Sequence, residues 1–263
     1  MKLIRSRDNP FFKSLKRLAE SGRERRKAGR TLLDGVHLVA AYEQAVGPVE
    51  TLVVAESALG GGEVAAYVDG RECAVLADAL MRDLGLVDTP SGLLAVAAMP
   101  AATVAVDPEK DAILLDGVQD PGNVGTLLRT AAAAGVKQAL LSPVCAAAWS
   151  PKVLRAGQGA HFALAIHEDA DLAEFMADFR GTTAVTCLDS ATSLYEAKWH
   201  GPLAWVFGAE GQGVRRELIA AARLRIRISM PGAVESLNVG AAAAICLFEM
   251  VRRRATAVPG DLA

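Results

Sequence analysis

The chain has 263 residues, 52% of them apolar, and a net charge of −2, which suits a folded protein with one large domain or two smaller ones. It has no run of about 18 apolar residues and no apolar centre near its N-terminus, so we expect no membrane span and no export signal, and we place the protein in the cytoplasm. Its dispersed cysteines lack a CxxC spacing and its histidines are scattered, so we expect neither a disulfide scaffold nor a metal site.

The first hundred residues predict a small α/β unit with a basic beginning. Residues 1–30 carry eleven Lys and Arg against three Asp and Glu. An amphipathic helix is expected over 9–28, interrupted near Ser21 and Gly22. This basic arm suggests a polyanionic partner, although a charged helix is also typical of a solvated surface. The expected elements that follow are strands at 31–34 and 49–57, a helix at 36–46, a turn at 60–62, a strand and then a helix within 73–85, and a closing strand at 92–100.

A polar, proline-containing stretch at 101–112 indicates a linker, and a new pattern begins after it. A fully apolar strand at 111–118, a helix that ends at Gly135 and a strand at 138–144 make a βαβ start. Further strands are expected at 182–189, 203–210 and 223–230, alternating with helices at 171–179 and 215–223. This alternation predicts a mostly parallel sheet covered by helices on both faces.

Two of the joints between a strand and the next helix are rich in Gly, Asn and Glu, and such joints bind ligands in open α/β sheets. In the first, Pro121 and Gly122 make a turn and Asn123 is expected to cap the helix. In the second, the strand 203–208 leads into a glycine-rich turn with Glu210. That turn lacks the third glycine of a dinucleotide fingerprint, because Arg216 stands there, so an NAD-type oxidoreductase is disfavoured.

A third joint lies between the last strand and a long apolar helix. Ser236 is a good N-cap for a helix that we expect to begin near Leu237. Capping does not explain Asn238, nor the alternation of Arg225 and Arg227 along the strand before it.

The three joints together are far more specific than any one of them. LLDGVQDPGNVGTLLRTAAAAGV, WVFGAEGQGV and ISMPGAVESLNVGAAAAICLFEM, in this order, resemble the three signature motifs of the SpoU (TrmH-like) family of RNA 2′-O-ribose methyltransferases, in the SPOUT superfamily. SPKVLRAGQGAHF is similar to that family's linking segment. The resemblance implies an L30e-like, RNA substrate-binding α/β domain at 1–100, a linker at 101–109 and a methyltransferase domain at 110–263 with a C-terminal trefoil knot.

The resemblance also implies S-adenosylmethionine as cofactor and a role for each motif residue. The expected cofactor-binding residues are Gly208, Gly211, Ile228, Met230 and Leu237. The expected catalytic residues are Asn123, Arg129, Glu210, Ser236 and Asn238. In the family the arginine that matches Arg129 is proposed to contact phosphate and assist deprotonation of the ribose hydroxyl. Since a guanidinium has a pKa above about 12, we expect Arg129 to polarise and position, with Glu210 as the alternative proton acceptor. The reaction needs no metal.

An RNA partner gives the basic arm a function, because phosphate neutralisation dominates RNA affinity. The expected RNA-binding residues are Lys13, Lys16, Arg17, Arg25, Arg26 and, nearer the active site, Arg155. By resemblance, the apolar helix after Leu237 closes the knot and forms a homodimer interface. Ribosomal RNA is favoured over transfer RNA as substrate. The alternative is a non-catalytic RNA-binding or ribosome-assembly factor with the same fold, which the intact motif residues disfavour.

Overall fold

The computed structural model describes residues 3–86, 90–100, 104–187, 190 and 192–256. The chain divides into two compact units, one formed by Met1–Ala101 with Ala147–Phe162 and the other by Ala102–Ala146 with Ala163–Ala263. The expected linker at 101–109 lies partly outside the described residues, and its described part, 104–109, contains no helix or strand. No helix in the described part of the chain is long and apolar enough to cross a membrane.

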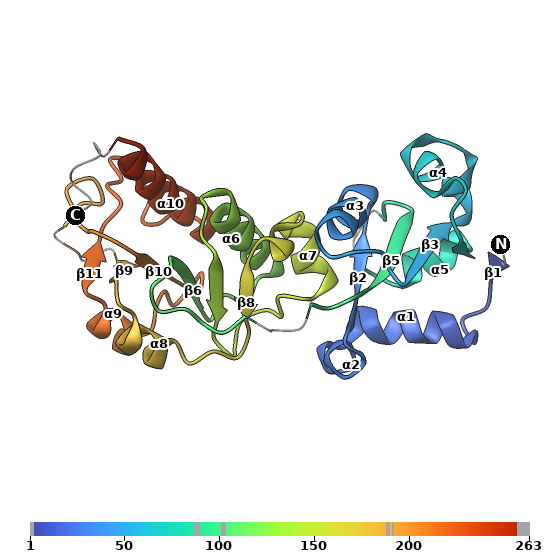
Figure 1. Ribbon diagram of the computed structural model, residues 1–263, viewed down its shortest axis with the longest axis horizontal. Coiled ribbons are helices and arrows are strands. Elements are labelled where there is room, and N and C mark those ends of the chain that lie inside the picture. The colour runs from blue at the N-terminus through green and yellow to red at the C-terminus, as the bar shows by residue number, and fades with distance from the viewer. Residues whose placement is uncertain (1–2, 87–89, 101–103, 188–189, 191, 257–263) are drawn as a thin grey trace. The chain divides into compact units, whose positions relative to one another are not determined.

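Among the described residues, the first unit contains a five-stranded mixed sheet in the order β1-β4-β3-β5-β2 (Figure 1). β1, β4 and β3 are parallel neighbours, whereas β5 runs antiparallel to both β3 and β2. The strands are β1 (Leu3–Ile4), β2 (Arg30–Asp34), β3 (Thr51–Ala55), β4 (Cys73–Leu76) and β5 (Leu93–Ala98). The helices are α1 (Pro10–Glu20), α2 (Gly22–Ala28), α3 (Val36–Ala45), η1 (Glu56–Gly60), α4 (Gly62–Val68), α5 (Asp78–Asp83), α7 (Pro151–Gly157) and η2 (Ala160–Phe162).

The expected break in the basic helix is confirmed at Ser21. The Asn9 side chain caps α1, which then buries Phe12, Leu15 and Leu18 at helical spacing. Ser21 has extended backbone that ends α1, and its hydroxyl accepts the N–H of Glu24 to start α2. β1, α4 and α7 were not expected from the sequence.

Each face of the first sheet has its own core. One core contains Leu32, Val53 and Leu76 of the sheet under α1 and α5. The other contains Leu33, Val54 and Leu93 under α3 and α4, together with side chains from the 147–162 segment, namely Trp149, Leu154 and Phe162. The Thr31 hydroxyl also donates to the Trp149 carbonyl at 2.8 Å. The 147–162 segment is therefore part of this unit's core.

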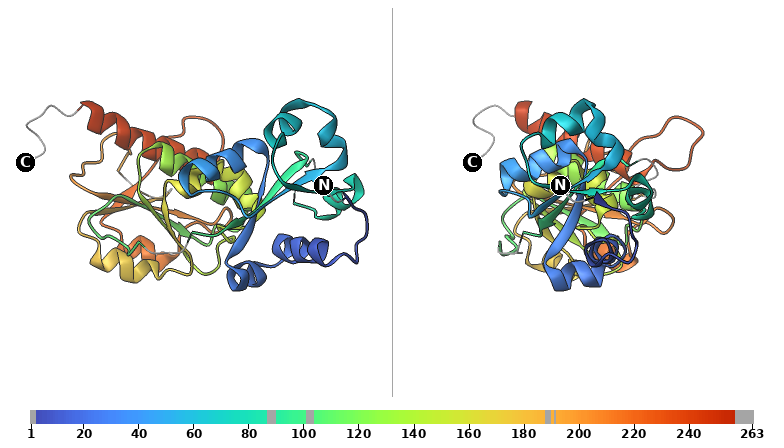
Figure 2. Two further views of the ribbon diagram at one scale, coloured as in Figure 1. Left: turned by 45° about the vertical axis from the view of Figure 1, so that its right-hand side comes forward. Right: turned by 90° about the vertical axis from the view of Figure 1, so that its right-hand side faces the viewer.

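The second unit contains, within the described chain, a six-stranded sheet in the order β11-β9-β10-β6-β7-β8, and each of its strand pairs is parallel. α6 and α10 cover one face of this sheet, and α8 and α9 cover the other (Figures 1 and 2). This confirms the predicted parallel α/β architecture. The strands are β6 (Ala112–Asp116), β7 (Gln138–Leu141), β8 (Ala165–His167), β9 (Thr182–Thr186), β10 (Leu203–Gly208) and β11 (Leu224–Ile226). The helices are α6 (Pro121–Ala133), α8 (Leu172–Asp178), α9 (Arg216–Ala221) and α10 (Val239–Thr256).

Alternation along the strands explains the two cores of this unit. Leu114 of β6 and Val206 of β10 pack under α8 and α9 with Phe175 and Leu218. Their neighbours in sequence point to the opposite face of the sheet, where α6 and α10 lie. Because helices cover both faces, the central strands β6 and β10 are buried almost throughout and read as continuous apolar runs.

Candidate functional site

A pocket of about 590 Å³ lies at the carboxyl ends of β9, β10 and β11 and at the beginning of α10. Loops at the carboxyl ends of parallel strands are the usual ligand sites of open α/β sheets. The wall consists mainly of the loop that follows β10 and the loop that joins β11 to α10. The lining residues are Thr186, Cys187, 207–214, Ile226, Ile228, Met230, 235–239 and Ala242.

The loop after β10 is fixed at both of its ends. A Cβ on Gly208 would lie 2.1 Å from the backbone carbon of Gly213, so only glycine allows this close return of the chain. Gly213 has φ 68° and donates its N–H to the Ala209 carbonyl at 2.8 Å. The buried carboxylate of Asp116 then accepts both the backbone N–H and the Nε–H of Arg215, each at 2.8 Å. The pocket loop therefore has a defined shape.

The three sequence motifs meet in one chain of hydrogen bonds beside the pocket. Asn123 donates from Nδ2 to Glu210 Oε1 at 2.7 Å, and Asn238 donates from Nδ2 to Asn123 Oδ1 at 3.0 Å. Asn238 Oδ1 accepts the N–H groups of Gly240 at 2.8 Å and Ala241 at 3.3 Å. This series of hydrogen bonds thus runs from the N-terminus of α10 to the Glu210 carboxylate. The side-chain amides of Asn123 and Asn238 are each bonded through both their nitrogen and their oxygen.

The expected N-caps Asn123 and Ser236 are wrong, and the observed caps explain why Asn123 and Asn238 take part in these hydrogen bonds. α6 begins at Pro121, and Asp120 is its N-cap, because the Asp120 side chain accepts the N–H of Asn123 at 2.8 Å. α10 begins at Val239 and is capped by Asn238 rather than Ser236. Asn123, displaced from the cap position, has its side chain available for Glu210. The sequence did indicate Asp120 as the cap, because it directly precedes Pro121 and proline favours the first helical position.

The expected cofactor-binding residues all line the pocket, as do three of the five expected catalytic residues. The two sets are, respectively, Gly208, Gly211, Ile228, Met230 and Leu237, and then Glu210, Ser236 and Asn238. Sequence reasoning did not single out Glu235, which also lines the pocket and directly precedes Ser236. Its position inside the third motif was the available signal.

Arg129 lies apart from this lining set. It is exposed on α6, and within the described chain its guanidinium makes no hydrogen bond or ion pair. α10 approaches α6 one turn earlier, where a Cβ on Gly240 would lie 2.9 Å from the Thr126 side chain. Arg129 is therefore a surface cation beside the packed start of α10.

Comparison with known proteins identifies the family. Residues 111–248 match the SpoU rRNA Methylase family, and residues 9–95 match the MRM3-like substrate binding domain. The chain belongs to the SpoU rRNA methylase family. It is 30% identical over 253 residues to the 23S rRNA (guanosine(2553)-2'-O)-methyltransferase RlmP of Bacillus subtilis, covering 95% of this chain and 99% of that one. It is 38% identical over 173 residues to the 23S rRNA (guanosine-2'-O-)-methyltransferase RlmB of Bordetella pertussis, covering 62% of this chain and 71% of that one.

Solved structures resemble this SpoU methylase over nearly its whole length. A crystal structure described as an RNA 2'-O ribose methyltransferase is 30% identical, has a TM-score of 0.83 and covers 97% of this chain and 100% of its own. An AdoMet-bound rRNA methyltransferase from Sinorhizobium meliloti is 26% identical, has a TM-score of 0.77 and covers 97% and 99%. The α/β fold is thus that of the family.

The basic residues expected to bind RNA divide into two groups in this SpoU methylase. Arg25 is buried and donates to the carbonyls of Leu18 and Ala19 at the end of α1. Arg155 pairs at 2.5 Å with the buried carboxylate of Asp34, and the ammonium of Lys16 bonds to Asp83. Lys13 is exposed but paired with Asp8 at 2.8 Å.

The second group of cations is exposed and without an ion pair in the described chain. Arg17 and Arg26 belong to it, as expected from the sequence. Arg23 and Lys27 also belong to it, and sequence reasoning missed them although they lie in the same charged run. We call Arg17, Arg23, Arg26 and Lys27 the α1–α2 patch.

No group of three or more His, Cys, Asp or Glu side chains among the described residues is arranged to hold a metal ion.

Proposed function

We propose that this protein transfers a methyl group from S-adenosylmethionine to a ribose 2′-hydroxyl of RNA, with ribosomal RNA favoured over transfer RNA, in the cytoplasm. The observation that carries the proposal is the hydrogen-bonded chain of Asn123, Glu210 and Asn238, which unites the three motifs beside a pocket. Membership of the SpoU family and relatives named as 23S rRNA 2'-O-methyltransferases support it.

The pocket residues fit S-adenosylmethionine in size and chemistry. A volume of about 590 Å³ is in the usual range for small-molecule sites. Ile228, Met230 and Leu237 offer apolar surface for a purine ring, and the glycine-rich loop offers backbone groups for polar atoms. Glu210 and Glu235 place carboxylates on a pocket that would receive a cation. When bound, the cofactor supplies an activated methyl group on a positively charged sulfur.

The remaining chemistry falls to residues of this chain, which align the ribose and remove its hydroxyl proton. Arg129 is exposed and unpaired in the described chain, so it suits binding of the substrate phosphate and polarisation of the hydroxyl. Glu210 is the better proton acceptor, because Asn123 fixes one of its oxygens beside the pocket and a carboxylate can accept a proton, whereas a guanidinium has no acceptor atom. Ser236, exposed at the pocket, provides a hydroxyl for the ligands.

The second unit is inferred to be knotted and dimeric. The loop after β10, the loop after β11 and the start of α10 come together around one cavity, as a trefoil knot of the C-terminal segment would require. Phe248 of α10 is 48% exposed on a helix that also packs against α6. We infer that the face of α10 that exposes Phe248 forms a homodimer interface.

The first unit is inferred to bind RNA through the α1–α2 patch. Its four cations have no ion pair in the described chain, so they can neutralise phosphates without first breaking internal contacts. Arg25, Lys16 and Arg155 are left out of this surface, since their charged groups are bonded within the unit.

The deciding experiment maps ribose methylations in total RNA from cells with and without the gene, and repeats the transfer with purified protein and labelled S-adenosylmethionine. We expect one ribose methylation to disappear from ribosomal RNA and to be restored in vitro. Transfer to a base atom would contradict the proposal. An Arg129→Ala variant should keep RNA binding and lose transfer, whereas an unchanged methylation map with intact RNA binding would favour the non-catalytic alternative.

A further inference from the structure

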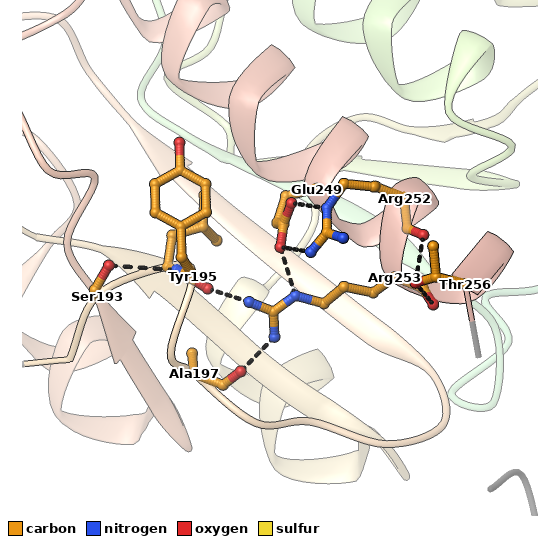
Figure 3. Close-up of polar contacts among 8 residues, drawn as sticks. Ser193, Tyr195, Ala197, Glu249, Arg252, Arg253 and Thr256 are labelled. Atoms are coloured by element: carbon orange, nitrogen blue, oxygen red, sulfur yellow. Dashed lines mark hydrogen bonds and ion pairs between the residues drawn. The ribbon is translucent and has the colours of Figure 1, made fainter. Parts of the chain in front are cut away.

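Arg253, near the end of α10, joins three parts of the second unit (Figure 3). It donates from Nε to Glu249 Oε1 at 2.6 Å, from one terminal nitrogen to the Leu194 carbonyl at 2.6 Å, and from the other to the Ala197 carbonyl. Its guanidinium carbon also lies 4.1 Å from the centre of the Trp199 ring. The side chain is 23% exposed. The whole fork of this arginine is therefore engaged in internal contacts.

Glu249 holds the guanidinium in this orientation. The carboxylate is 7% exposed and also accepts two hydrogen bonds from Arg252, at 2.7 and 2.8 Å. The hydrogen bonds from Arg252 and Arg253 lower the pKa of Glu249 to about 2. The carboxylate is therefore ionised at any working pH, and Arg253 keeps its charge partner.

Arg253 contacts Leu194, Ala197 and Trp199 of the 192–199 segment, and this segment is bonded in turn to the backbone just before the pocket. Arg227 donates its N–H to the Thr192 carbonyl and accepts the N–H of Leu194, both at 2.9 Å. Arg227 directly follows β11, and the next residues along the chain include Ile228 and Met230, which line the pocket. This hydrogen-bonded route connects the end of α10 to one pocket wall.

A second route runs through aromatic rings. Trp199 meets Trp205 of β10 edge to face, with ring centres 6.2 Å apart. Trp205 stacks with Phe207, with ring centres 6.1 Å apart, and Phe207 lines the pocket. Both routes start at Arg253 and end in the pocket wall, whereas Arg253 itself is not among the lining residues.

We propose that Arg253 is a positioning residue that sets the affinity of the pocket for S-adenosylmethionine by fixing the walls formed by Phe207, Ile228 and Met230. This inference rests on the proposed cofactor. A contact that orients a site from outside it acts on binding through the geometry of the groups it holds. Loss of Arg253 should therefore weaken cofactor binding and leave the rate at saturating cofactor nearly unchanged.

The test compares Arg253→Met with Arg252→Met. Methionine keeps an unbranched stem against Trp199 and removes the hydrogen bonds to Leu194, Ala197 and Glu249. Arg252 is the matched control, because it bonds to the same Glu249 but to neither carbonyl of the 192–199 segment. Titration calorimetry with S-adenosylmethionine should show a Kd about tenfold higher for Arg253→Met and within about twofold of wild type for Arg252→Met.

Two further measurements complete the design. Amide hydrogen exchange at Leu194 and Arg227 should be faster in Arg253→Met alone. kcat at saturating cofactor should stay within about threefold of wild type, with KM for the cofactor raised in step with Kd.

A folded Arg253→Met variant with wild-type Kd, or with lowered kcat and unchanged Kd, would overturn the inference. If that variant does not fold, Arg253→Lys decides. The single nitrogen of lysine cannot take the positions of the three guanidinium nitrogens that bond to Glu249, Leu194 and Ala197, so a Kd raised a few-fold supports the inference and a wild-type Kd overturns it. If the wild-type protein binds no S-adenosylmethionine, the proposed function fails, and the exchange at Leu194 and Arg227 still shows whether Arg253 holds the segment.

Discussion

The chain contains two arginine-rich segments, one in α2 of the first unit and one at the end of α10 of the second. In α2, Arg23, Arg26 and Lys27 are exposed and have no ion pair in the described chain. At the end of α10, by contrast, the three consecutive arginines bond to Glu249, to Asp111 and to backbone carbonyls. The difference teaches that the three-dimensional surroundings, rather than the density of charge along the chain, decide whether a basic run stays available to solvent and ligands or holds the fold together.

The largest expected effect comes from removing the free cations of α2. A variant with Arg23, Arg26 and Lys27 all replaced by Gln should bind RNA about 100-fold more weakly at moderate salt and lower the slope of log K against log salt by about two to three, because each phosphate contact contributes to both. Filter binding over a range of salt concentrations measures both quantities. Lys13→Gln is the control, since that ammonium is already paired with Asp8, and an equal loss there would break the comparison.

Glu249→Gln should act on stability instead of RNA affinity. Gln cannot hold two guanidinium groups as a carboxylate does, and since solvent screens the exposed Arg252, we expect the free energy of unfolding to fall by about 2 kcal/mol at pH 7. The pKa of Glu249 is lowered by folding, so this stabilisation is present above about pH 4.5 and disappears as the pH falls towards 2. Urea unfolding at several pH values tests both points; a pH-independent difference would contradict the assignment.

Arg25 and Arg26, neighbours in α2, test the difference between internally bonded and exposed cations at single residues. Arg25→Met removes hydrogen bonds to the carbonyls at the end of α1 and should lower the free energy of unfolding by about 1 kcal/mol. Its neighbour Arg26→Met should leave stability unchanged and weaken RNA binding. Thermal unfolding and RNA binding of the two variants, measured side by side, would refute the distinction if both lost the same property.

The smallest effect is expected at Arg254, which bonds to Asp111 and to the Gly201 carbonyl. Its side chain is 41% exposed, so solvent screens the pair. Arg254→Met should lower the free energy of unfolding by less than about 1 kcal/mol and leave RNA affinity unaltered. Urea unfolding in low and high salt checks this, because only a screened ion pair loses its contribution as salt is added.

Most helices and strands could be predicted from the local pattern of apolar and polar residues. The caps of α6 and α10, and which basic side chains form internal contacts, could not. The break between α1 and α2 was predictable because Ser21 carries its own capping chemistry. The N-cap of α6 was misplaced at Asn123, which lies inside that helix, and the N-cap of α10 at Ser236, because more than one residue near each helix start favours capping. The Asn123 side chain bonds instead to Glu210 and Asn238. These partners are far apart in the sequence, as are the carbonyls that bind Arg253, so no local pattern reveals them.

The 147–162 segment has a consequence for how the protein is made. It lies in sequence between strands of the second unit, yet Trp149, Leu154 and Phe162 complete the core of the first. During synthesis the first unit therefore emerges from the ribosome with this face of its sheet covered by α3 and α4 but without its 147–162 part, and it stays so while β6, α6 and β7 are being translated. The core of the first unit cannot be completed before part of the second unit has been translated, and a nascent chain released at residue 100 would expose the apolar side chains that Trp149, Leu154 and Phe162 cover in the folded protein.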